Sequence, residues 1–275
     1  MDKPARPIER ERILAMKILF GIMGFLIIDL YMNLIPQLFD LRQATPWLLY
    51  ASLFLVLVHW VAKLTGLRGV GELGLTGHYG WKRNVRIGFL LGASAWAAMF
   101  GLLAASEALH IVGVRGATGA AAFLSKAFAV AFLGSLMNEL VVRGYVFAHL
   151  KGKIGNGYLL LLAACLYAFD DIWLSGFRAS QVLASIMLGL SLGFVLLRTN
   201  SIWMSAGIST GVSFVSSLLY GIPGHSDGKG LLVVADAGSG NLIDHAQSYT
   251  ALMLLFIILL AFRRLRMNKA AIEQL

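Results

Sequence analysis

The chain has 275 residues, of which 58% are hydrophobic and 13% charged, and its mean hydropathy is +0.76. Soluble domains are about a quarter charged, so this composition excludes an ordinary soluble protein and indicates an integral membrane protein. The net charge of +9 is interpreted as a set of orientation signals around membrane spans, and no nucleic-acid partner is expected.

Apolar segments long enough to cross a bilayer, about 17–25 residues each, follow one another along the chain. The fourth is longer than the others, which indicates a tilted helix or one that extends beyond the membrane. The sequence therefore predicts an all-α fold, a polytopic transmembrane bundle of about eight spans, near residues 13–35, 47–65, 86–108, 118–148, 157–175, 181–198, 201–220 and 249–263.

The basic residues predict the orientation of this bundle. Most of the 23 lysines and arginines fall in segments that share one side if there are eight spans and both termini are cytoplasmic. The segments predicted to lie outside hold Arg42, Arg115, Arg178 and Lys229, whereas Lys126 and Arg143 fall within spans. Because cytoplasmic loops carry the excess of basic residues, both termini are predicted to be cytoplasmic.

Four regions are expected. They are a cytoplasmic segment with two added helices (1–68), a helical core (69–220), an outer loop (221–248), and a last span with a basic cytoplasmic tail (249–275).

The outer loop and the single cysteine give no sign of a metal or disulfide. The loop carries residues of metal-ligand type, but their spacing matches no compact site, and one cysteine cannot form an internal disulfide. No cofactor or metal is expected. The residues considered were His225, Asp227, Asp236, Asp244 and His245 in the loop, and Cys165 in an apolar run.

The stretch "SLMNELVVRGY" places two charges inside the fourth span. Glu139 and Arg143 are four residues apart, so on a helix they share a face and can pair. Charges in hydrocarbon are costly and usually mark a site or a buried pair. Two interpretations follow: an ion pair that fixes helix packing, or a carboxylate that activates water with Arg143 orienting it.

The adjacent aspartates Asp170 and Asp171 lie near the outer end of the fifth span. Interfacial solvation would explain at least one of them. If they lie within the bundle, one is expected to bind Arg143, Lys126 or a ligand. A transporter would draw on Lys126 and these aspartates, but the chain lacks the paired broken helices and repeat symmetry common in that class.

Ser209 and Ser213 share a face of the seventh span, next to Gly207 and Gly211. Small residues in membrane spans permit close helix approach. A nucleophilic serine needs a base within reach, and no histidine occurs within the last four predicted spans, which argues against a serine hydrolase.

Three motifs, in order on three predicted helices, make the chain resemble the CPBP family, the CAAX protease and bacteriocin-processing (Abi) intramembrane glutamate proteases, over roughly 69–220. The family's Glu-Glu-x-x-x-Arg corresponds to Asn138, Glu139 and Arg143. Its Phe-x-x-x-His corresponds to Tyr167 and Asp171, and its His-x-x-x-Asn to Ser209 and Ser213.

The resemblance implies a site in which a first glutamate activates water with two histidines, while an asparagine contributes to the oxyanion site. At these positions the chain has Asn138, Asp171, Ser209 and Ser213. The leading hypothesis is therefore a non-proteolytic membrane protein that binds a membrane protein or a lipid-modified peptide. The alternative is a rewired peptidase that uses Glu139, Asp171 and Arg143. The resemblance also implies a bacterial inner membrane.

Overall fold

A computed structural model describes residues 7–77, 79–114, 119–223, 230–235 and 240–272. These residues form long helices, three short helical segments and two strands. In chain order the elements are α1 (Pro7–Leu38), α2 (Ala44–Leu64), η1 (Val70–Leu73), α3 (Trp81–Ala105), β1 (His110–Val114), α4 (Ala120–Asn138), the π-helical segment η2 (Glu139–Tyr145), α5 (Val146–Leu150), α6 (Asn156–Ser175), α7 (Ala179–Thr199), α8 (Ile202–Tyr220), β2 (Leu232–Ala235) and α9 (Gly240–Ile272).

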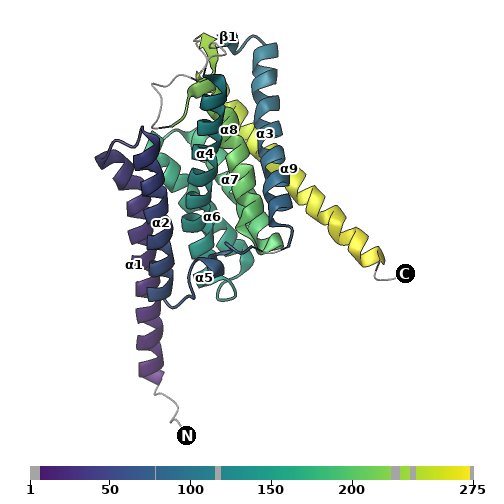
Figure 1. Cartoon of the computed structure of the whole chain (residues 1–275). Helices are drawn as coiled ribbons and strands as arrows, with labels where there is room; N and C mark the ends of the chain where they lie inside the picture. The colour runs from purple at the N-terminus through teal and green to yellow at the C-terminus, as the bar shows by residue number, and fades with distance from the viewer. Residues whose placement is uncertain (1–6, 78, 115–118, 224–229, 236–239, 273–275) are drawn as a thin grey trace.

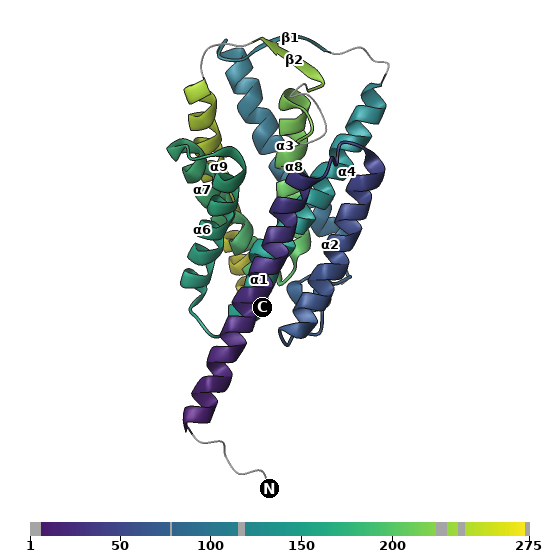
Figure 2. The same cartoon turned by 90° about the vertical axis from the view of Figure 1, so that its left-hand side faces the viewer.

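The helices form a bundle around two buried apolar clusters (Figures 1 and 2). One cluster joins α1, α2, α4 and η2, and the other joins α3, α7, α8 and α9. The outer faces of α1 and α9 expose many large apolar side chains, among them Leu19, Phe20, Phe256 and Leu260. Lipid would cover such faces, because a membrane helix needs no polar outer surface.

Seven helices in the described part of the chain are long and apolar enough to cross a membrane. They are α1, α2, α3, α7, α8, α9 and the rod formed by α4, η2 and α5. The predicted fifth span corresponds to α6, which has 20 residues and packs on α7 but is not among those seven. The all-α membrane fold predicted from the sequence is thus confirmed.

The predicted outer loop at 221–248 is wrong in part. Residues 232–235 form β2, which pairs antiparallel with β1, and α9 begins at Gly240 rather than near residue 249. The small sheet escaped prediction because its strands are short and more than a hundred residues apart in sequence. Arg115, His225, Asp227, Lys229 and Asp236 lie outside the described residues.

The fourth predicted span contains a local change of helix type. α4, η2 and α5 follow one another without a break, and η2 covers the whole stretch from Glu139 to Tyr145. Insertions of π-helix are rare and frequently occur at functional sites. The backbone geometry therefore changes at the residues that carry the first motif.

η2 is tightly enclosed by the N-terminal elements. A Cβ atom on Gly144 would lie 2.8 Å from the carbonyl oxygen of Leu73 in η1, so glycine is what allows η1 to approach η2. On another side, a Cβ on Gly24 of α1 would overlap the Tyr145 hydroxyl. The core predicted to begin at residue 69 is thus packed directly against α1.

The described ends of α1 and α9 both extend beyond the bundle away from the β1–β2 sheet (Figure 1). α1 continues well below the other helices, and α9 leans outward toward its end. The described ends of both helices therefore project from the same end of the bundle.

Candidate functional site

Glu139 and Arg143 form an ion pair inside the bundle. Arg143 Nη1 donates to Glu139 Oε1, and both side chains have an exposed fraction of 0%. The contact predicted from the four-residue spacing is therefore present. Because neither group reaches solvent, each depends on the other for charge compensation.

Arg143 also lies against a ring from α6. Its guanidinium carbon is 4.7 Å from the centre of the Tyr167 ring, a cation–π geometry. Arg143 Nε and Nη2 are buried and find no acceptor among the described residues. Tyr167, the first residue of the second motif, thus covers the cation of the first motif.

Asp170 is buried, with 5% of its surface exposed, so interfacial solvation does not explain this residue. Its Oδ1 accepts from Asn33 Nδ2 of α1 at 2.8 Å, and its Oδ2 accepts from Asn138 Nδ2 at 2.9 Å. The sequence predicts that one of the two aspartates binds Arg143, Lys126 or a ligand if they lie in the bundle. Instead, two amides from different helices hold Asp170.

The other two candidates have separate partners. Asp171 Oδ2 accepts a hydrogen bond from the Ser185 hydroxyl of α7. Lys126 Nζ donates to the backbone oxygen of Arg42 at 3.0 Å, near the loop between α1 and α2. Asp171 and Glu139 therefore each have a different hydrogen-bond partner.

Ser209 is buried and Ser213 is half-buried in the middle of α8. Next to them, Gly207 and Gly211 face Gly88 and Gly92 of α3 so closely that a Cβ on any of the four would overlap backbone atoms of the opposite helix. The prediction of close helix approach at this part of α8 is confirmed.

Asn33 is held at the site by the geometry of α1. Pro36 has no N–H to donate to the carbonyl oxygen of Met32, and Tyr50 OH of α2 donates to that oxygen at 2.8 Å. Tyr31 stacks on Tyr50 with ring centres 5.4 Å apart. These contacts fix the part of α1 that carries Asn33, and Figure 2 shows α1 crossing the bundle between α6 and α2.

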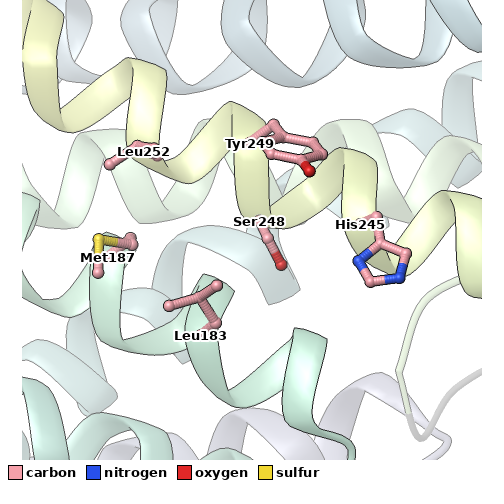
Figure 3. Close-up of a pocket in the computed structure, with 6 residues that line it drawn as sticks. All are labelled: Leu183, Met187, His245, Ser248, Tyr249 and Leu252. Carbon is pink, nitrogen blue, oxygen red and sulfur yellow. The ribbon is translucent and has the colours of Figure 1, made fainter.

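Two cavities in the described structure lie away from the predicted site residues. One, of about 130 Å³, lies between α7 and α9 and is lined by His245, Ser248, Tyr249 and Leu252 of α9 above Leu183 and Met187 of α7 (Figure 3). The other, of about 90 Å³, lies beside Gly144 and Lys151. The residues of the three motifs line neither.

Sequence reasoning missed Asn33 and Ser185, the partners of the two aspartates. A signal existed for Asn33, because it is a polar residue within the apolar run of the first span. Ser185 carried none, because a serine in a membrane helix is common and often bonds its own backbone. Ser185 does also donate to the carbonyl oxygen of Gln181.

These features define a polytopic helical membrane protein that encloses an ion pair and an amide-held carboxylate in its core. A family model described as Rce1-like, type II CAAX prenyl endopeptidase Rce1-like, matches residues 120–215. The match confirms the CPBP, or CAAX protease, resemblance found in the sequence. All seven positions assigned to the motifs fall within it, whereas Asn33 does not. No curated protein and no solved structure matches the chain.

Replacing Asn33 by alanine is expected to destabilise the protein by about 1–3 kcal/mol, because a buried acceptor of Asp170 loses its donor. Thermal unfolding of the purified protein in detergent measures this. Asn156, exposed at the start of α6, is the control, and its alanine variant should stay within about 0.5 kcal/mol of wild type. Equal stability of the two variants would show that the Asn33–Asp170 contact contributes nothing.

Proposed function

We propose that this protein is a non-proteolytic relative of the CAAX proteases, which binds a membrane partner within the helical frame that a peptidase would use. The partner is another membrane protein or a lipid-modified peptide. Under this proposal the protein shares the helical arrangement of the matched family but uses it for binding, because one fold can support different functions.

The observation that carries the proposal is the hydrogen bonding of Asn138. This residue stands where the family resemblance implies a water-activating glutamate, and its amide donates to Asp170 at 2.9 Å. An amide cannot act as a general base near neutral pH. Glu139 is the neighbouring carboxylate, and its exposed fraction of 0% and its pairing with Arg143 favour a structural role.

The membrane in which the protein lies and the orientation of its termini are proposed as well. We infer a bacterial inner membrane from the family resemblance, with both termini cytoplasmic. The distribution of basic residues supports this orientation, and so does the projection of the described ends of α1 and α9 on one side of the bundle.

A rewired peptidase is the second candidate, because α6, which carries Asp171, packs against η2, which carries Glu139. Two carboxylates in different environments could divide the roles of acid and base. Water would have to reach both, and the hydroxyls of Ser209 and Ser213 would have to serve the oxyanion.

The deciding experiment combines affinity purification from native membranes with a cleavage assay on a prenylated CAAX-type peptide. Under the proposal, the wild type releases no product above background, and a stoichiometric membrane partner is retained. Ser213→Leu, which fills the half-buried face of α8, should lose that partner. Ser94→Leu, on an exposed face of α3, should keep it.

The peptidase candidate predicts the opposite pattern. Wild-type protein would cleave the peptide, and Asp171→Asn would abolish cleavage while its thermal unfolding remained that of the wild type. This result would overturn the binding proposal even if a partner were also retained.

A further inference from the structure

The buried carboxylates of the bundle outnumber the cations that compensate them. Arg143 is used by Glu139, and the remaining ion pairs in the described part of the chain, Asp40–Arg42 and Arg68–Glu72, lie at its surface. Asp170 is 5% exposed, and its hydrogen bonds come from two neutral amides. A negative charge without a cationic partner is expensive within a membrane bundle.

A second carboxylate increases this imbalance. Asp29 lies one turn before Asn33 on α1 and interacts electrostatically with Asp170. Asn33 Nδ2 donates to the backbone oxygen of Asp29 at 3.2 Å as well as to Asp170. Two carboxylates on facing helices therefore flank one asparagine, and like charges so placed repel each other unless a positive charge is near.

Unused oxygen atoms lie on the same side of α4. Ser135 is one turn before Asn138, so the two side chains share the helix face that Asn138 turns toward Asp170. Ser135 is 5% exposed, and neither its Oγ nor Asn138 Oδ1 has a hydrogen-bond partner among the described residues. Each Asp170 oxygen accepts one amide hydrogen and keeps a further lone pair.

We propose that Asp170, Asn138 and Ser135 form a binding site for one sodium ion, close to Asp29 and closed on the α1 side by Asn33. Oxygen atoms of carboxylate, amide and hydroxyl groups are the ligands that hard cations take. A single buried carboxylate with neutral oxygens suits a monovalent ion. No group of three or more histidine, cysteine or acidic side chains suited to a metal occurs among the described residues. This proposal is independent of whether the protein cleaves peptides.

The ion would link three helices. α1 lies outside the region matched by the family model, and α4 and α6 lie within it. A cation among the side chains of Asp170, Asn138 and Ser135 would hold α4 against α6, and neutralising Asp170 would let Asp29 of α1 remain nearby. Sodium should therefore stabilise the packed bundle by mass action.

The test is thermal unfolding of the full-length protein in detergent, with NaCl titrated against choline chloride at constant ionic strength and pH. The wild-type Tm should rise with sodium, saturate, and stay unchanged with choline. Equilibrium binding of radioactive sodium should give one ion per chain. Asp170→Asn should abolish both effects.

Ser135→Ala keeps the proposal testable if Asp170→Asn does not fold. In choline, this variant should be as stable as wild type or more so, because it removes a buried hydroxyl that has no partner. Its sodium affinity should fall by about tenfold, the loss expected for one ligand. Ser191→Ala, a buried serine of α7 that bonds the carbonyl oxygen of Met187, should keep the wild-type affinity.

Three results would overturn the proposal. They are a wild-type Tm that does not distinguish sodium from choline, equal sodium affinities for Ser135→Ala and Ser191→Ala, and stabilisation by acid without any response to sodium. The last result would assign the missing positive charge to a proton. None of these readouts depends on partner retention or peptide cleavage, so this proposal and the proposed function can fail separately.

Discussion

Glu139→Gln is expected to destabilise the folded bundle by about 3–5 kcal/mol, the cost of breaking a buried ion pair by removing one partner. The substitution keeps the shape of the side chain and removes its charge, so that Arg143, with an exposed fraction of 0%, remains as an uncompensated buried cation. The Tyr167 ring recovers a small part of this loss through its cation–π contact. Chemical or thermal unfolding in detergent measures the change.

The control for this prediction is the double variant Glu139→Leu/Arg143→Met. Replacing both members of a buried pair by apolar side chains of similar volume is often neutral or stabilising, so the double variant should be more stable than Glu139→Gln. If Glu139→Gln unfolded with the wild type, the pair would not be a structural clamp, and a free carboxylate available for chemistry would become the better interpretation.

Gly92→Ala is expected to destabilise the protein by about 1–3 kcal/mol or more, since it forces α3 away from α8. The new methyl group would overlap the backbone oxygen of Ile208, and a backbone atom cannot turn aside as a flexible side chain can. Gly207→Ala on the facing helix would overlap the backbone oxygen of Val85 and should have a similar effect. The separation would also displace Ser209 and Ser213, which lie next to this contact.

Gly101→Ala supplies the matched control on the same helix. No atom lies within 4 Å of a Cβ added at Gly101, and alanine is favoured over glycine in a helix by roughly 0.5–1 kcal/mol. This variant should therefore be as stable as wild type or slightly more stable. Unfolding curves that coincide for Gly92→Ala and Gly101→Ala would show that the two helices pack less tightly than the structure has them.

Local sequence patterns were enough to predict one contact of the candidate site and one helix contact. Glu139 and Arg143 meet because a four-residue spacing returns a side chain to the same face of a helix. The spacing of Gly207 and Gly211 likewise predicts a close helix neighbour, although it does not identify α3 as that neighbour. Both predictions depend on the periodicity of a single helix.

The contacts of the aspartates could not be obtained in this way. Asp170 binds Asn33 and Asn138, which are 137 and 32 residues away in the sequence, and Asp171 binds Ser185 on the next helix. Such pairs depend on the rotation of each helix about its axis and on its depth beside its neighbours. An apolar run long enough to span a membrane specifies neither.

The sequence by itself determined that this chain is a helical membrane protein with a CAAX-protease-like core. The length of its apolar segments and the order of its motifs are properties of the sequence and need no knowledge of the packing. The tertiary structure decided that α1 contributes Asn33 to that core, and that β1 pairs with β2. It did so because packing side chains from distant segments selects one arrangement of the helices, and this arrangement places the buried carboxylate of Asp170 between two amides.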